Sequence, residues 1–250
     1  GRRWMASTRV SPSPNVFKSK KDAQDAVPAA IQKQLDGIFQ KAKAADIALF
    51  GRMLAGMPEH NVDAACQVAH AISTHEVAMD MDFYTAVDDL KPNDTQGADM
   101  MGVVEFNSAC FYRYSVVDVA KLMANLGGDK ELAAKTVEAY LRAAIDAVPT
   151  GKQNSMAAHN PPSFVRVLAR EKGQPWNLAN AFLKPVRVPR DGADDLAGLS
   201  GSALQDHLAK LRRGYGAAFV LDKKFDLDDA ESTTVAELVA AAGAAVRGAT

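Results

Sequence analysis

Three consecutive patterns between residues 61 and 114 decide the fold that we expect from this sequence: NVDAACQVAHAISTH (61–75), MDMDFYTAVDDL (79–90) and MMGVVEFNSACFYRY (100–114). The first has apolar residues at helical spacing from Val62 to Ile72, which predicts a helix. The second is rich in aromatic and acidic residues. The third alternates in character and predicts one long strand over residues 103–117. A helix, an excursion and a strand in this order indicate an element that projects from a sheet.

The rest of the chain predicts further helices and short strands. Helices are expected over about residues 27–45, 117–126, 132–148, 178–183 and 204–211, and from a cap at Thr233 or Thr234 to residue 246. Strands are expected at DIALFGRM (46–53), from residue 163, and at GAAFVL (216–221). Strands separated by paired helices predict an α+β fold with a ferredoxin-like sheet of the RNA-recognition-motif type.

The domain organisation follows from where periodic patterns are found. Residues 1–21 carry Ser, Pro and basic residues without a period, so we expect a disordered basic segment there. Residues 22–250 are expected to form a single domain with an excursion at about 76–102. At 250 residues and 48% hydrophobic content, one domain of this size can bury a large core.

Composition also bears on location. No apolar run approaches the roughly 18 residues that a membrane-spanning helix needs. The basic opening is not followed by the apolar region of a secretory signal. The two cysteines, Cys66 and Cys110, have no CxxC neighbours, which favours a reduced, cytoplasmic protein with buried thiols; a disulfide between them is the alternative.

The charge of the chain does not by itself indicate a nucleic-acid partner. The formal net charge is −1 and the isoelectric point is near 6.6, whereas nucleic-acid-binding domains often exceed about 9. The charge is unevenly spread, since six basic residues precede the first acidic residue, Asp22: Arg2, Arg3, Arg9, Lys18, Lys20 and Lys21. Between Glu76 and Glu105 the only basic residue is Lys91.

Several residues could in principle support metal chemistry. His70 and His75 are five positions apart, and on the expected helix they would point about 140° away from each other. The zinc-protease pattern needs histidines at i and i+4 with a glutamate after the first, which this sequence lacks. Four acidic residues could hold Mg²⁺, but no EF-hand or P-loop spacing accompanies them: Asp80, Asp82, Asp88 and Asp89. We therefore predict a protein without enzymatic activity or cofactor, and keep a metal-dependent nuclease as the alternative.

Six blocks of sequence, in order, carry a resemblance to a known family: DIALFGRM (46–53), VDAACQVAHAISTHEV (62–77), DFYTAVDDL (82–90), GVVEFNSACFYRY (102–114), GKQNSMAAHNPPSFVRV (151–167) and NLANAFLKPV (177–186). This ordered set resembles the Cascade backbone subunit of type I-E CRISPR systems, the CasC family, which coats guide RNA. The resemblance implies an RNA-recognition-motif-like palm, a helical finger region and a β-hairpin thumb. It also implies polymerisation along crRNA, with target DNA reached through the guide duplex and with other Cascade subunits as partners.

The resemblance further implies which residues contact RNA. Met53 in the turn Gly51-Arg52-Met53, Tyr84, and Met101 match the family's nucleotide-wedging positions. Exposed Met and Tyr side chains can clasp a base, and a stacked base is worth about 1–3 kcal/mol without its identity being read. The alternative is that these residues are ordinary core residues.

One part of the family pattern has no match in this chain. Members begin with a palm strand and a helix rich in Arg, Lys and Ser that contacts the RNA backbone, and residues 1–44 do not reproduce that layout. We therefore expect a chain that lacks the family's N-terminal part. A structural subunit that binds only other proteins is a further alternative to an RNA-binding subunit.

Overall fold

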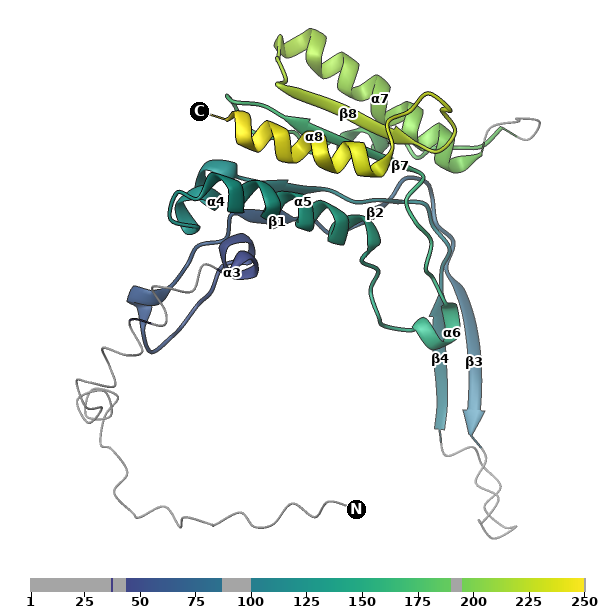
Figure 1. Ribbon diagram of the computed structural model, residues 1–250. Coiled ribbons are helices and arrows are strands. Elements are labelled where there is room, and N and C mark those ends of the chain that lie inside the picture. The colour runs from purple at the N-terminus through teal and green to yellow at the C-terminus, as the bar shows by residue number, and fades with distance from the viewer. Residues whose placement is uncertain (1–36, 38–43, 87–99, 190–194, 250) are drawn as a thin grey trace, which may run out of the picture.

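The computed structural model describes residue 37 and residues 44–86, 100–189 and 195–249 as a mixed α/β structure (Figure 1). The helices are α3 (Ala45–Phe50), α4 (Val119–Asn125), α5 (Lys130–Asp146), α6 (Gln153–Met156), α7 (Leu196–Tyr215) and α8 (Val235–Gly248), with short 3-10 turns η1 (Pro58–His60) and η2 (Ala179–Phe182). The strands are β1 (Cys66–Val68), β2 (Ile72–Ser73), β3 (Asp80–Ala86), β4 (Met100–Phe106), β5 (Phe111–Tyr112), β6 (Ser115–Val117), β7 (Phe164–Ala169) and β8 (Leu221–Asp226). Within these ranges, no helix has both the length and the apolar character needed to cross a membrane.

Three of the four antiparallel strand pairs follow one another along the same two segments. β1 pairs with β6, β2 with β5 and β3 with β4, so that residues 66–86 run against residues 100–117. From Val68 to Ile72 the first segment advances by four residues, whereas the opposite segment, from Tyr112 to Ser115, advances by only three. Extra residues of this kind bend and twist a ribbon. The ribbon turns away from the body, and its β3–β4 end projects from it (Figure 1).

This ribbon corrects the prediction of a helix over residues 61–75. The segment instead forms β1 and β2, and of its residues only Ala65, Cys66 and Thr74 are buried. Pairing with residues 111–117 satisfies its backbone, and this distant partner overrides a local pattern made largely of small residues. The strand expected over residues 103–117 is present as β4, β5 and β6, interrupted where the ribbon bends.

The strand predicted at residues 46–53 is also wrong, because this segment begins as helix α3. Ala48 and Leu49 are adjacent and both buried, a pattern that a short apolar run can give in either a helix or a strand. Gly51 ends the helix with φ of +78° and donates its N–H to the Ile47 carbonyl over 2.9 Å. A Cβ at Gly51 would lie 2.6 Å from the Val62 carbonyl oxygen, so this turn requires glycine.

After residue 117, α4, α5, α7, α8 and β7 confirm the prediction, the helix predicted over residues 178–183 is the short 3-10 turn η2, and the strand predicted over residues 216–221 is wrong. β8 begins at Leu221, whereas the prediction ended there. Thr234, not Thr233, caps α8: its Oγ1 accepts from the Glu237 N–H over 3.3 Å, and the Glu237 carboxylate accepts from the Thr234 N–H over 2.9 Å. This reciprocal pair is a capping box.

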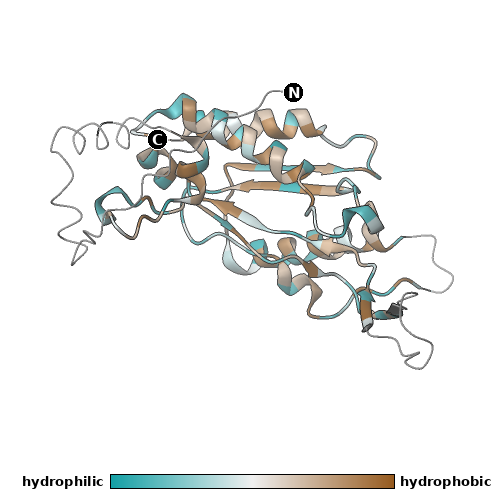
Figure 2. Ribbon diagram, turned by 90° about the horizontal axis from the view of Figure 1, so that it is seen from below, coloured by the Kyte–Doolittle hydropathy of each residue, from teal (hydrophilic) through white to brown (hydrophobic). Residues whose placement is uncertain are grey.

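Two apolar clusters hold these elements together. The larger joins α3, α4, α5 and α8 and includes Leu122 and Leu126, both fully buried. The smaller joins α7 to η2 through Leu178, Phe182, Leu204 and Leu208. Figure 2 shows hydrophobic and hydrophilic positions interleaved along these helices, as is usual for helices with one buried side.

The α+β class that we predicted is therefore confirmed at the level of a mixed α/β structure with small antiparallel sheets, while the RNA-recognition-motif-like palm and the domain limits stay predictions. The described strands form four separate two-stranded pairs. Residues 1–21, and nearly all of the helix predicted over residues 27–45, lie outside the described part of the chain.

Candidate nucleic-acid interface

The β3–β4 hairpin presents two different faces. Its register pairs Met81 with Glu105, Phe83 with Val103, and Tyr84 with Gly102. Because neighbouring residues of a strand belong to opposite faces, Met81, Phe83 and Val103 share one face and Tyr84 and Gly102 the other. The first three side chains are 60%, 66% and 51% exposed. The hairpin therefore carries an apolar face that no described residue of this chain covers.

Tyr84 lies directly over Gly102 on the opposite face. The Tyr84 side chain is 46% exposed, and a Cβ at Gly102 would collide with its ring. An aromatic ring laid across a cross-strand glycine is a known way to stabilise a strand that contains glycine. Gly102 thus leaves the space that the outer end of the Tyr84 ring occupies, while much of the side chain stays exposed.

Met53 lies at the other end of the ribbon, in the turn that follows α3. Its side chain is 84% exposed. The turn is closed by hydrogen bonds between the backbones of Arg52 and Val62, of 2.8 and 2.9 Å. The Arg52 guanidinium donates to the His60 carbonyl, with Nη2 at 2.9 Å. Gly51 and Arg52 thus position Met53, and a direct RNA contact by either of them stays a prediction.

The predicted site residues do not converge within one chain. Met101 pairs with Thr85, next to Gly102 on β4, so it belongs to the hairpin face opposite that of Tyr84. The Ala65 N–H donates to the Leu49 carbonyl, which ties α3 to the start of the ribbon, whereas Tyr84 is near its far end. Figure 1 shows the α3 turn and the hairpin on opposite sides of the body.

The residues of the nuclease alternative are also spread out. His70 is exposed in the loop between β1 and β2, and His75 follows β2, where its Nδ1 is 3.1 Å from Ser73 Oγ; the helix expected to carry both is absent. Asp80 and Asp82 are exposed on β3, while Asp88 and Asp89 lie outside the described residues. In the part of the chain that is described, no three His, Cys, Asp or Glu residues are grouped to hold a metal ion.

The two cysteines are free thiols, so the disulfide alternative is not observed. Cys66 lies on β1 and is buried in the larger apolar cluster, and this burial raises the pKa of its thiol, against a smaller lowering by a hydrogen bond with Tyr140. A raised pKa leaves the thiol protonated near neutral pH and so makes it a weak nucleophile or metal ligand. Cys66 acts here as a small core residue.

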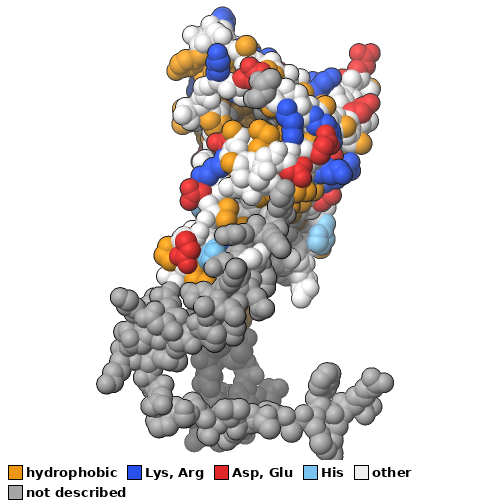
Figure 3. Space-filling view, turned by 60° about the vertical axis from the view of Figure 1, so that its left-hand side comes forward, with side chains coloured by type: hydrophobic (Ala, Val, Ile, Leu, Met, Phe, Trp, Pro, Cys, Tyr) orange, Lys and Arg blue, Asp and Glu red, His pale blue; other side chains and the backbone are white. Residues whose placement is uncertain are grey.

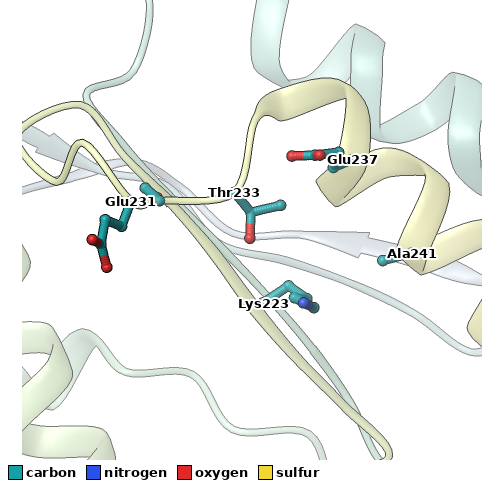
Figure 4. Close-up of a pocket in the computed structure, with 6 residues that line it drawn as sticks. Lys223, Glu231, Thr233, Glu237 and Ala241 are labelled. Carbon is teal, nitrogen blue, oxygen red and sulfur yellow. The ribbon is translucent and has the colours of Figure 1, made fainter.

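A hollow of about 490 Å³ lies between β8 and the start of α8 (Figure 4). Lys223, Glu231, Thr233 and Glu237 are among the residues that line it. Hydrogen bonds from the backbone and hydroxyl of Thr234 lower the pKa of Glu237, whose carboxylate is already engaged in the helix cap. The remaining charges are of both signs and do not converge, so this hollow does not suggest a reaction centre.

Two features that the sequence did not predict are found outside the ribbon. Lys152 and Ala157, on either side of α6, have φ of 61° and 47°, a left-handed conformation that is uncommon without glycine.

The second of these features is a stack of arginine and aromatic side chains near the end of α7: Arg170, Trp176, Arg212 and Phe219. Elsewhere on the upper body, Figure 3 shows Lys and Arg intermixed with Asp and Glu. The clustering of basic and aromatic residues over 212–219 was the available sequence signal for the stack.

Comparison with known proteins agrees with this architecture. A family model described as CT1975-like protein matches residues 4–244. A solved chain titled "CRISPR RNA-guided surveillance complex, pre-nicking" is 28% identical, with a TM-score of 0.72 over 90% of this chain and 63% of that chain. A second, titled "CRISPR RNA-guided surveillance complex", is 30% identical, with a TM-score of 0.66 over 86% of this chain and 82% of that chain. A search of curated proteins found no match.

These matches determine how specific an assignment of this chain they support. The chain spans less than two thirds of the first solved chain and most of the second. The resemblance to a CRISPR-associated subunit is confirmed at this level, and the narrower assignment to the CasC family of type I-E systems stays a prediction.

Proposed function

We propose, since this chain belongs to the CT1975-like protein family, that it is a guide-RNA-binding backbone subunit of a type I-E Cascade complex. In this proposal, copies polymerise along the crRNA, and other Cascade subunits bind the resulting filament. Base pairing between guide and target DNA supplies the sequence recognition, while the protein contacts backbone and shape. The titles of the two solved structures support an RNA-guided assembly.

The observation that carries the proposal is the separation of Met53 from Tyr84. The chain between Cys66 and Tyr84 runs mostly extended for up to about 60 Å at about 3.3 Å per residue. The two exposed side chains thus lie at opposite ends of one ribbon. In a head-to-tail filament, the hairpin of one copy can reach the α3 turn of the next. Each nucleotide site would then take Tyr84 from one copy and Met53 from its neighbour.

The two hairpin faces suit two different contacts. The Tyr84 ring offers a flat surface on which a base can stack, or an edge that can separate two bases. The opposite face, with Met81, Phe83 and Val103, offers apolar side chains that a neighbouring copy can bury. Exposed apolar patches of this kind on a soluble domain commonly mark an interaction surface.

The proposal includes no catalytic step, and the absence of enzymatic activity remains a prediction. The metal-dependent nuclease is tested by incubating the protein with RNA or DNA and Mg²⁺ or Mn²⁺. Cleavage that EDTA abolishes, and that His75→Ala or Asp80→Asn removes, would support the nuclease and contradict the proposal. The cytoplasmic location is likewise a prediction.

The deciding experiment mixes two variants during assembly on guide RNA. Met53→Ala and Tyr84→Ala are each expected to weaken RNA-dependent assembly by about 1–3 kcal/mol, the value of one lost stack. If each site is shared between copies, an assembly from both variants contains sites with both wild-type side chains and an equal number with neither. Because Met53 and Tyr84 would clasp the same base, losing the second side chain of a site should cost less than losing the first, so the mixture assembles better than either variant alone. If each site lay within one chain, mixing would restore nothing.

A matched control separates these effects from a general loss of surface area. Leu183 is 81% exposed on the body, close to the exposure of Met53, and it lies outside the ribbon. Leu183→Ala should assemble like the wild type. The proposal fails if guide RNA does not change the assembly state of the wild-type protein, an outcome that would favour a purely structural subunit.

A further inference from the structure

Five side chains near the end of α7 form an arginine–aromatic stack: Arg170, Trp176, Arg212, Tyr215 and Phe219. The Arg170 guanidinium lies 4.7 Å from the Trp176 ring centre and 5.6 Å from that of Phe219. The Arg212 guanidinium lies 4.6 Å from the Phe219 ring. The Trp176 ring is 5.5 Å from Phe219 and 6.0 Å from Tyr215. Each arginine thus lies over at least one ring, and Trp176 also contacts two other rings directly.

Three separate segments bring these residues together. β7 and β8 pair antiparallel from Phe164–Asp226 to Ala169–Leu221, so Arg170 and Phe219 emerge side by side where the pair ends. Gly216 ends α7 with φ of 60°, and the chain after it returns so that Phe219 lies beside Arg212 of the helix. The geometry is thus fixed by the sheet register and by a helix cap.

The stack carries more positive than negative charge. Asp222 accepts from Arg166 over two bonds of 2.8 Å and also from Arg212, so one carboxylate serves two arginines. Arg170 donates to the Gln174 carbonyl over 2.9 Å, and no described carboxylate forms an ion pair with it. Three arginines therefore face a single acid, and the Arg170 guanidinium retains donors that an anion could accept from.

Packing explains only part of the cluster. Trp176 and Phe219 rest on the smaller apolar core, which accounts for their positions. Tyr215 is 76% exposed and Val220 is 59% exposed, so neither contributes much to that core. Trp176 thus contacts both an exposed ring, Tyr215, and Arg170, which has no described carboxylate partner, a combination that folding does not require.

We propose that the arginine–aromatic stack is a second contact for nucleic acid, which binds a single strand of DNA or RNA. A base would stack on the exposed Tyr215 ring, and a phosphate would accept hydrogen bonds from Arg170. A single strand fits because a duplex hides the faces of its bases, whereas an unpaired base offers one to an aromatic ring. Such contacts do not depend on base identity.

This contact is distinct from the hairpin and does not require that the hairpin bind RNA. Ser200 Oγ donates to Thr74 Oγ1 over 2.9 Å, which fixes the first part of α7 to the ribbon just after β2. From Ser200 to Tyr215 the helix rises about 22 Å at about 1.5 Å per residue. Nucleic acid bound at the stack is therefore either a different molecule from the RNA near the base of the hairpin or a distant part of the same molecule.

The test uses the full chain and two labelled oligonucleotides, one of thymidine and one of uridine, measured by fluorescence anisotropy. Tyr215→Ala should weaken binding about tenfold, within the range for one lost stack, and Arg170→Gln should weaken it by a similar factor through the loss of charged hydrogen bonds to a phosphate. Lys210→Gln, which removes an exposed charge from another face of α7, should change binding much less. Arg170→Lys should restore part of the loss, because it keeps the charge without the planar guanidinium. The two oligonucleotides tell whether DNA or RNA is preferred.

Photocrosslinking gives a readout that does not depend on affinity. With 5-iodouracil in the oligonucleotide, adducts are expected on the peptides that contain Trp176 or Tyr215, and they should persist in Tyr84→Ala. Wild-type affinity of both Tyr215→Ala and Arg170→Gln, or adducts only on the hairpin, would overturn the proposal. The proposal would also be overturned if Tyr215→Ala and Arg170→Gln bound nucleic acid normally but failed to retain another protein subunit. If only Tyr84→Ala lost guide-dependent assembly, that result would bear on the proposed role of the hairpin and not on the test of the stack.

Discussion

The β3–β4 hairpin and the α5–α8 helix pair use apolar side chains for opposite purposes. In the helix pair, Ala133, Ala134 and Leu238 are completely buried, and removing any of them from water stabilises the fold. In the hairpin, Met81, Phe83 and Val103 are at least half exposed and stabilise little. An isolated two-stranded hairpin is marginal in water, and this one is continued by the β2–β5 and β1–β6 pairs into the body. Stability is thus concentrated in the body, and the hairpin is left free to bind.

The largest effect expected from this contrast is at Leu122, which is fully buried in the larger core. Leu122→Ala should lower the free energy of unfolding by about 2–5 kcal/mol, since it removes apolar contacts and leaves a cavity. Phe83→Ala, which removes a larger side chain from the hairpin, should change it by less than about 0.5 kcal/mol, as is usual at exposed positions. Chemical denaturation measures both. Comparable losses would mean that the hairpin face is packed and that the contrast is wrong.

A smaller effect is expected at Asp222, which joins β8 to β7 and α7. Burial raises the pKa of this carboxyl, but hydrogen bonds and charge from Arg166 and Arg212 outweigh that effect and hold the pKa below its usual value. Since the folded pKa is below the unfolded one, the stabilisation is present above about pH 4 and is lost as pH falls through the folded pKa. Asp222→Asn should cost about 2 kcal/mol at neutral pH, between the values for exposed and buried pairs.

The pH dependence supplies the check on that prediction. Unfolding curves of wild type and Asp222→Asn should approach each other as the pH falls from about 4 through the lowered pKa of folded Asp222, because the carboxyl is protonated first in the unfolded state and last in the folded one. A gap that stays constant down to about pH 2 would show that the asparagine disturbs packing and that the charge contributes nothing measurable.

The elements that could be predicted from the sequence lie in the stable body of the molecule, and those that could not lie in or beside the ribbon. α5, α7 and α8 have clear helical periods, and Asp129, Asp195 and Thr234 cap them through contacts within three residues. These signals are local, so the helices after residue 117 were predictable. Residues 61–75 were not, because β1 and β2 exist only through pairing with residues about 40 to 50 positions away, as in the Ile72–Tyr112 and Cys66–Val117 pairs.

The candidate sites show the same limit. Exposure of Tyr84 and Met53 agrees with a binding role that only the family resemblance suggested. That Tyr84 and Met101 belong to opposite faces follows from the register of β3 and β4, which no local pattern fixes. The arginine–aromatic stack depends on where β7 and β8 end, and so it could not be assembled from sequence spacing alone.

Two glycines sharpen the comparison, because the same substitution meets different surroundings. At Gly51, in the body, alanine would have to adopt φ of +78° with its Cβ 2.6 Å from the Val62 carbonyl oxygen and 2.9 Å from the Ala64 nitrogen. Backbone atoms cannot easily move away, so Gly51→Ala should destabilise the protein by about 1–3 kcal/mol. Thermal unfolding measures this. A wild-type melting temperature would mean that the turn after α3 is free to rearrange.

Gly102→Ala in the hairpin should have the smallest effect on stability and a separate effect on binding. The colliding atoms belong to the outer end of the Tyr84 ring, which can swing aside, and Gly102 does not need a positive φ. Replacing glycine by alanine also reduces the entropy of the unfolded chain, worth about 0.4–1 kcal/mol, which offsets part of the lost contact. The free energy of unfolding should therefore change by less than about 1 kcal/mol in either direction.

Assembly of Gly102→Ala on guide RNA should nevertheless weaken by as much as one stack, about 1–3 kcal/mol, because the displaced Tyr84 ring no longer lies where a base can meet it. If Gly102→Ala assembled on RNA as well as the wild type while Tyr84→Ala did not, the ring would be required but its position over Gly102 would not.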